Sequence, residues 1–381
     1  MEQPKLGFIS MFPTVDTLTT KTRAGYNPIG GTNNTNVIYL KSKPHQLFDG
    51  TFRNDELAAD LLSMGRLGKP LEQKRKGTRT WVIDAQLLDE VADMANGYKL
   101  ANKESAAGEL AAKEWLTRLL LATSGDRVIA LPYGNPDIDL AKRSAPSELR
   151  LYYAYGAERV SFHLNRSVAV ENDSGWSTGK SRLSPVLRKK YTQNRQALTA
   201  LSTVVSADEV RAQRAKLAIL LSPSLNKKDR EFFSYDATDG VENTLNKLRV
   251  TSGKYQITSQ SGKVPVTVIN GFNVPVKINI QVTPLNSRVQ VSDISALTIP
   301  ANARTQLALP FSVIAPGATT ILAQITNTDG EFVGASARLA LNITIFDSRV
   351  TWFTVGAAIL LFVAAITQTI RRIRKGRHEN K

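Results

Sequence analysis

The chain has 381 residues, of which 42% are hydrophobic and 22% are charged, a composition typical of folded domains. It contains no cysteine, which excludes disulfides, cysteine-bound metals and thiol catalysis. The formal net charge is +16, with basic clusters at residues 180–195 and 371–381. No nucleic-acid-binding motif accompanies these clusters, so the expected partners are membrane lipid or an anionic cell-wall polymer.

The first part of the chain has the pattern of an α/β unit. Residues 1–36 are polar and predict an irregular segment, and residues 37–250 alternate short apolar runs with helical periodicity. The expected strands are 37–40, 80–84, 127–131 and 158–162, and the expected helices are 54–64, 85–95, 106–123, 144–156, 185–221 and 236–248. Strands separated by helices indicate a parallel sheet or a partial (β/α) barrel-like domain with a helical C-terminal part.

The period of the apolar pattern changes to two over residues 255–346. The expected strands are 264–271, 274–282, 288–292, 304–310, 319–330 and 337–346. Alternating short strands separated by Gly, Pro and Asn predict an immunoglobulin-like antiparallel β-sandwich. The side chains expected to point into its core are Val266, Val268, Ile278, Ile280, Leu307 and Leu309.

The end of the chain predicts a membrane anchor. Residues 350–370 contain no charged side chain, and a helix of that length is about as long as the hydrocarbon core of a bilayer is thick, roughly 30 Å. The basic tail 371–381 follows directly, which predicts a single-pass protein of the cell membrane, with residues 1–349 outside and the tail in the cytoplasm. Because the chain does not open on a signal peptide, we also expect its true start to lie upstream.

Four residues follow predicted parallel strands and are therefore candidates for a site. They are Asp84 after the second strand, and Tyr133, Asn135 and Asp137 after the third. In parallel α/β folds the functional side chains gather at the carboxyl ends of the strands. Asp84 and Asp137 could form the acid–base pair of a glycan hydrolase. Both also stand where helices begin, and the prediction we favour is that they cap those helices.

Other site chemistry finds no support in the sequence. The three histidines, His45, His163 and His378, lack the spacing of a helical metal motif. The elbow motif of serine hydrolases and the phosphate loop of nucleotide-binding proteins are both missing from the sequence. We therefore expect no metal and no cofactor.

Several stretches, read together, resemble an uncharacterised family of actinobacterial envelope proteins. They are residues 43–61, 80–98, 128–139 and 248–280, together with the Arg-rich chain end. The resemblance implies an exported α/β domain distantly similar to sugar-active barrels, then an immunoglobulin-like domain, then one transmembrane helix. It also implies work in the cell envelope, because genes of that family often neighbour a lipid II flippase gene. Family members are usually longer, with a signal peptide and an N-terminal β region.

The function we expect is non-catalytic binding of cell-wall material or of a membrane partner through the α/β domain. The sandwich would act as a spacer and docking surface. One alternative is a glycan hydrolase that uses Asp84 with Asp137. Another is an accessory subunit of a transporter or flippase, bound to an integral membrane protein.

Overall fold

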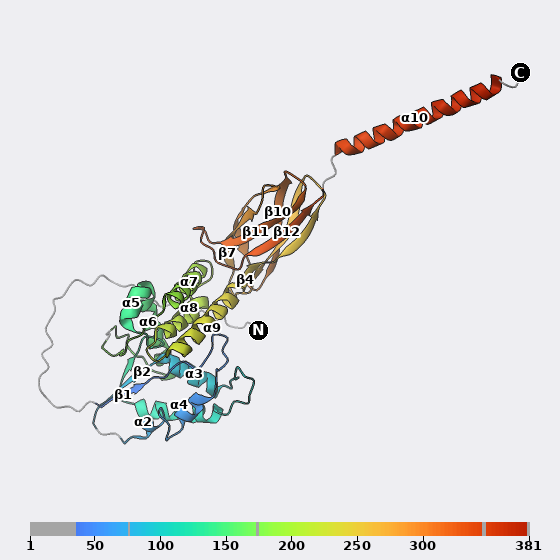
Figure 1. The fold of residues 1–381 in the computed structure, drawn as a ribbon. Helices are drawn as coiled ribbons and strands as arrows, with labels where there is room; N and C mark the ends of the chain where they lie inside the picture. The colour runs from blue at the N-terminus through green and yellow to red at the C-terminus, as the bar shows by residue number, and fades with distance from the viewer. Residues whose placement is uncertain (1–35, 75–76, 173–174, 345–347, 379–381) are drawn as a thin grey trace, which may run out of the picture.

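The fold is that of a computed structural model, which describes residues 36–74, 77–172, 175–344 and 348–378. An α/β part comes first along the chain, a β-sandwich follows, and the helix α10 comes last (Figure 1). The polar segment predicted for residues 1–36 lies outside the described residues except for Asn36, which opens the first strand.

The α/β part is built around a parallel sheet that has, among the described residues, three strands in the order β1-β2-β3. They are β1 (Asn36–Leu40), β2 (Arg79–Ile83) and β3 (Arg127–Ala130). Every residue of the central strand β2 is buried, as expected for a strand covered on both faces. Trp81 and Ile83 belong to a core shared with the helices, whereas Val82 packs with Ile129 and Leu131 in a second, smaller cluster. Because the strands are parallel, their carboxyl ends share one edge of the sheet.

Two groups of helices pack around this sheet. The first group is α1 (Glu56–Leu61), α2 (Lys69–Glu72), α3 (Ala85–Ala95), α4 (Glu109–Thr123), α5 (Ile138–Ser144) and α6 (Pro146–His163). The second group is α7 (Pro185–Leu201), α8 (Ala207–Lys216), the 3-10 helix η1 (Leu217–Leu221) and α9 (Lys227–Leu245), and it lies toward the sandwich (Figure 1). The region 185–221, predicted to be helical, is thus divided into three elements.

The strand predicted at residues 158–162 is wrong, because these residues form the last turns of α6. The buried side chains Tyr153, Ala157 and Val160 recur at intervals of three and four residues, which is a helical period. In the sequence, Gly156 suggested that a helix ended there. In the structure, Gly156 is instead the point at which α6 passes close to the backbone of Leu131. A Cβ at Gly156 would lie 2.3 Å from the carbonyl oxygen of Leu131. Without this strand, the described part of the sheet does not extend toward a barrel.

The sandwich consists, within the described residues, of two sheets. One has four strands in the order β4-β6-β10-β8, and the other has five in the order β5-β12-β11-β7-β9. Their bounds are β4 (Leu248–Val250), β5 (Gly253–Ile257), β6 (Ser261–Asn270), β7 (Val276–Pro284), β8 (Val289–Val291), β9 (Ile294–Ile299), β10 (Arg304–Val313), β11 (Gly317–Thr326) and β12 (Ala337–Ile343). Neighbouring strands are antiparallel except for β5, which pairs with β12 in parallel. The period-two pattern therefore predicted a sandwich that the structure contains.

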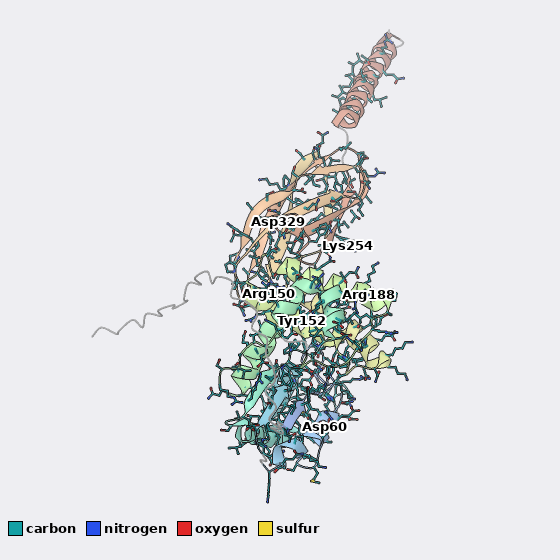
Figure 2. All side chains as sticks on the ribbon, turned by 90° about the vertical axis from the view of Figure 1, so that its left-hand side faces the viewer. Asp60, Arg150, Tyr152, Arg188, Lys254 and Asp329 are labelled. Atoms are coloured by element: carbon teal, nitrogen blue, oxygen red, sulfur yellow. The ribbon has the colours of Figure 1, made fainter. Side chains whose placement is uncertain are left out.

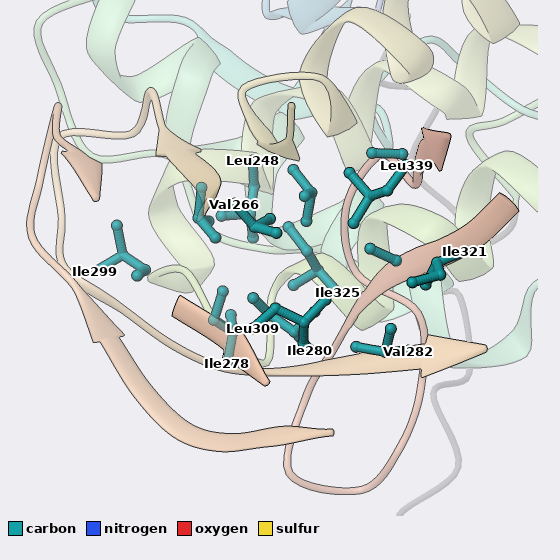
Figure 3. Close-up of a cluster of buried hydrophobic side chains, with 14 of the residues drawn as sticks. Leu248, Val266, Ile278, Ile280, Val282, Ile299, Leu309, Ile321, Ile325 and Leu339 are labelled. Atoms are coloured by element: carbon teal, nitrogen blue, oxygen red, sulfur yellow. The ribbon is translucent and has the colours of Figure 1, made fainter. Parts of the chain in front are cut away.

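Alternating apolar side chains from both sheets form the core of the sandwich (Figure 3). Five of the six predicted inward side chains are at most 2% exposed, namely Val266, Val268, Ile278, Ile280 and Leu309. The sixth, Leu307, is half-buried and packs against the same cluster. Burying aliphatic side chains of this size stabilises the fold by roughly 1.5–3 kcal/mol each.

The sandwich rests directly on the second group of helices. Leu201, Val205 and Val210 from the α7–α8 region belong to the same buried cluster as the sandwich residue Leu248. Beside them, the Asn327 side-chain amide donates a 2.9 Å hydrogen bond to Thr203 Oγ1. A shared apolar core ties the two parts together more firmly than a linker would.

The C-terminal helix requires a correction of the predicted fold class. The helix α10 (Ser348–His378) contains residues 350–370 and continues into the basic segment predicted to be a separate tail. In the part of the chain that the structure describes, no helix combines the length and the apolarity needed to cross a membrane. The transmembrane helix in the predicted fold class is therefore wrong, and the described fold is α+β.

Candidate functional site

An open cleft lies at the edge of the sheet where the parallel strands end. Its volume is about 570 Å³. The charged side chains that line it are Lys41, Lys43, Arg66, Glu56 and Asp60, and Asn135 reaches it from the loop after β3. Asp60 lies in the half of the molecule farther from the sandwich (Figure 2). We call this feature the sheet-edge cleft. Its position is the one in which open α/β sheets bind ligands.

Four of the five charges in the sheet-edge cleft form two ion pairs. Lys43 Nζ lies 2.7 Å from Glu56 Oε2, and Arg66 Nη2 lies 2.7 Å from Asp60 Oδ2. The Arg66 guanidinium also donates a hydrogen bond to Ser42 Oγ at 3.0 Å. These two pairs neutralise each other's charges, and Lys41, which hydrogen-bonds Thr178 Oγ1 at 3.4 Å, leaves a small positive excess in a lining rich in hydrogen-bonding groups. Such a lining suits a neutral polar ligand, of which a sugar is one example.

His45 and Ser42 lie together in this cleft, with 3.3 Å between Oγ and Nε2. Burial, with a contribution from the Lys43 charge, lowers the pKa of His45 from 6.5 to about 4. A neutral imidazole of such low basicity is a poor general base for a serine. The ring also hydrogen-bonds the Asn54 side chain. Asn54 is a neutral amide, and it lacks the negative charge with which a carboxylate in its place would raise the pKa of His45. This contact was not predicted, although the spacing Ser42–His45 directly after β1 could have suggested it.

Asp84 caps α3, as the sequence indicated, but it does so from a buried position. Its Oδ1 accepts hydrogen bonds from the Gln86 amide at 3.1 Å and from the Gly134 amide at 2.9 Å. Its Oδ2 has no hydrogen-bond partner among the described residues, and the residue is 1% exposed. Burial raises the pKa of Asp84 from 3.8 to about 7 against the opposing effect of these two amides. Hydrogen bonds from backbone amides alone would lower the pKa of a capping carboxylate, so at Asp84 the effect of burial outweighs that of capping.

Asp137 is occupied by backbone amides on both of its oxygens. Its Oδ1 accepts from the amides of Asp139 at 3.0 Å and Leu140 at 3.3 Å, and so caps α5. Its Oδ2 accepts from the Ser181 amide at 2.8 Å. Asp137 therefore joins the start of α5 to the segment that leads into α7, which is a structural role.

The side chains of Tyr133 and Asn135 have different surroundings, although both follow β3. The Tyr133 hydroxyl is buried and donates a 3.0 Å hydrogen bond to Asp89 on α3. Asn135 lines the sheet-edge cleft, and its side-chain oxygen accepts a 2.8 Å hydrogen bond from Ser177. Of the four predicted site residues, Asn135 alone is in the lining of the cleft.

A metal site is not formed by the described part of the chain. No group of three or more His, Asp and Glu side chains gathers there closely enough to hold an ion. The lysine, arginine, carboxylate, amide and hydroxyl groups that line the cleft can hydrogen-bond a polar ligand.

The sequence matches the model of a family of unknown function, DUF6049, over residues 158–378. This is more than half of the chain. The chain belongs to that family. The matched residues run from the end of α6 through the sandwich to α10, so the match includes the second group of helices and not the parallel sheet. No curated protein matches the sequence.

Solved structures similar to this chain cover about a quarter of it. WR4, a Caenorhabditis elegans member of the MSP family, is 13% identical with a TM-score of 0.20, over 26% of this chain and 99% of its own. The CARDB domain of a Pyrococcus furiosus protein is 12% identical with a TM-score of 0.21, over 26% and 94%. The PapD-like domain 7 of human CEP192 is 7% identical with a TM-score of 0.21, over 27% and 88%. These low scores carry no argument about function.

Proposed function

We propose that this member of the family is a non-catalytic binding protein of the cell envelope. In this proposal the sheet-edge cleft binds cell-wall glycan, and the sandwich serves as a spacer and docking surface. The location in the envelope is supported by the resemblance to envelope proteins and by the net charge of +16. The mostly neutralised, hydrogen-bonding lining of the cleft supports a glycan as the ligand.

The observation that carries this proposal is the separation of the two candidate carboxylates from the cleft. A glycosidase needs two carboxyl groups that flank the scissile bond across an open site. Asp84 has a pKa suited to a proton donor, but it is buried and is not in the cleft lining. Asp137 is occupied by three backbone amides. The hydrolase alternative that pairs Asp84 with Asp137 therefore has neither carboxyl group in the cleft lining.

The experiment is to block the sheet-edge cleft and measure binding to purified cell-wall glycan. Thr178 is exposed and lines the cleft, so Thr178→Trp adds a large side chain there without disturbing the core. We expect full-length Thr178→Trp to bind the glycan at least about tenfold more weakly in a sedimentation assay, which corresponds to about 1.4 kcal/mol.

The matched control is Thr298→Trp, which makes the same replacement at an exposed position of β9 in the sandwich. It should bind the glycan like the unmodified protein. If Thr178→Trp binds equally well while folding normally, the cleft is not the binding site. If the unmodified protein itself fails to bind wall glycan, the proposed function is wrong.

A further inference from the structure

A second cavity lies beside the sheet-edge cleft and has a different charge. Its volume is about 650 Å³, and it lies between the segment 180–187 and the first turns of α9. Pro223 lines both cavities, so the two are adjacent. The basic side chains in its lining are Lys180, Arg182, Lys227 and Arg230, and the acidic one is Glu231. We call this feature the basic groove.

The excess of positive charge in the basic groove is only partly neutralised from within the protein. Lys180 forms an ion pair with Asp139 at the rim. Arg182 and Lys227 are exposed to solvent. In the sheet-edge cleft, by contrast, Lys43 and Arg66 each face a carboxylate at 2.7 Å. The basic groove therefore keeps a positive field that attracts anions.

Arg230 gives the groove a rigid, positively charged wall. The residue is 6% exposed, and its guanidinium donates hydrogen bonds to Ser181 Oγ and to the carbonyl oxygens of Arg182, Ser222 and Leu225. These acceptors are neutral, so the hydrogen bonds fix the side chain, and the charge of the nearby Asp137 carboxylate offsets only part of its positive charge. A buried arginine held in this way is a preorganised cation.

Two helix N-termini strengthen the same field. Val186 and Leu187 in the first turn of α7, and Lys227 at the start of α9, all line the groove. Both helices are longer than 15 residues, and the N-terminal end of such a helix carries a partial positive charge and outward-facing amides. These features reinforce the side-chain charges and favour an oxyanion such as phosphate.

The remaining lining indicates a polymer segment rather than a single ion. Tyr235 and Val186 are 48% and 62% exposed, and they place apolar surface next to the cations. The Lys190 ammonium lies 4.3 Å from the centre of the Tyr235 ring, which adds a further cation at this rim. A cavity of this size is larger than one phosphate, and it alternates charged with apolar surface. This combination matches a chain of phosphates joined by polyol or sugar carbons.

We propose that the basic groove binds phosphodiester groups of a linear anionic cell-wall polymer. This inference rests on the proposed function and extends it. The sheet-edge cleft would bind neutral glycan, while the adjacent groove would bind the phosphate-bearing chain. The connecting residue Gly179 has a φ of +110°, and a Cβ there would lie 2.8 Å from Pro223 Cβ. The short segment between the two cavities is therefore shaped to pass close over Pro223.

The test is to remove two groove cations and measure binding of full-length protein to a glycerol-phosphate oligomer. Arg182→Gln with Lys227→Gln should weaken binding about fivefold, since each exposed ion pair is worth about 0.5 kcal/mol. The matched control is Arg338→Gln with Lys277→Gln, which removes one arginine and one lysine from exposed positions of the sandwich. The control should bind like the unmodified protein, and both variants should keep its unfolding temperature.

Three outcomes would overturn the inference. If both double variants bind the oligomer equally weakly, binding depends only on the net charge of the protein. Competition by inorganic phosphate as effective, per phosphate, as the oligomer would mean that the groove binds a free ion. If the groove double variant loses binding only to vesicles of anionic phospholipid, the groove cations bind a lipid surface. If the groove variant still binds isolated wall glycan while losing the oligomer, the proposed function stands independently of this result.

Discussion

Asp84→Asn should make the protein more stable at neutral and alkaline pH. Burial raises the pKa of Asp84 to about 7 in the folded state, whereas an aspartate in an unfolded chain has a pKa of about 3.9. Between these two pH values the unfolded chain releases a proton that the folded protein keeps. The folded state therefore loses stability as the pH rises from about 4 to about 7. The gap between the two pKa values corresponds to at most about 4 kcal/mol.

Asparagine keeps the capping oxygen and removes the charge that is costly to bury. Its amide nitrogen can take the place of Oδ2, which has no hydrogen-bond partner among the described residues. We expect Asp84→Asn to exceed the unmodified protein by about 2–4 kcal/mol at pH 8 and to match it within about 1 kcal/mol at pH 4. Urea unfolding followed by tryptophan fluorescence would measure this, because Trp81 and Trp115 are fully buried in the α/β part.

Asp137→Asn is the matched control, with the opposite expected sign. Both Asp137 oxygens accept from backbone amides, so an amide nitrogen in either place would face a donor. We expect a loss of about 1–3 kcal/mol at pH 8. If Asp84→Asn instead loses stability at pH 8 as Asp137→Asn does, then Asp84 is an ionised cap and our account of its burial is wrong.

Three further predictions test the packing and the buried histidine. Ile321→Ala, at a fully buried position of β11, should cost about 2–5 kcal/mol in urea unfolding followed by far-UV circular dichroism, and a cost below about 1 kcal/mol would contradict the assigned core. Gly156→Ala should destabilise the protein although alanine favours helices, because its Cβ would meet the Leu131 carbonyl oxygen; a higher unfolding temperature would contradict this. The unmodified protein should lose stability as the pH falls from 6.5 to 4, because the folded state resists protonation of His45 until about pH 4. His45→Gln should make that loss smaller by up to about 3 kcal/mol. Unchanged acid sensitivity in urea titrations over that range would show that His45 protonates without cost.

The sandwich could be predicted from the sequence because its signal is local. Along β6 and β7 every second residue is apolar, and the inward positions Val266, Ile278 and Ile280 follow from that alternation alone. The first three strands were also predictable, since each is a short apolar run preceded or followed by turn residues. In these segments the local preference and the tertiary environment agree.

The error at residues 158–162 has the opposite cause. In residues 158–162 the apolar Val160 and Phe162 alternate with polar residues, and so short an alternation fits a strand as well as a helical turn. Its helical state follows from Tyr153, Ala157 and Val160 packing on one side of α6. Gly156 concealed this pattern, because its role in bringing α6 close to Leu131 depends on a partner distant in sequence.

The properties of the site could be predicted even less well, because they arise from contacts between distant segments. That Asp84 caps a helix is a local fact, but its raised pKa depends on burial beneath the loop that contains Gly134. The ion pair between Lys43 and Glu56 neutralises part of the cleft only after the chain between them has folded back. The sequence pointed to the edge of the sheet where the cleft lies, without indicating the balance of charges there.

The most direct test of the central claim is to measure binding and bond cleavage in one experiment. Full-length protein would be incubated with purified cell-wall glycan, and both the bound protein and the newly released reducing ends would be measured over the same hours. We predict saturable binding, reduced by Thr178→Trp, with no release of reducing ends above the protein-free sample. Steady release that Asp84→Asn or Asp137→Asn abolishes, with folding intact, would contradict the account and establish a hydrolase.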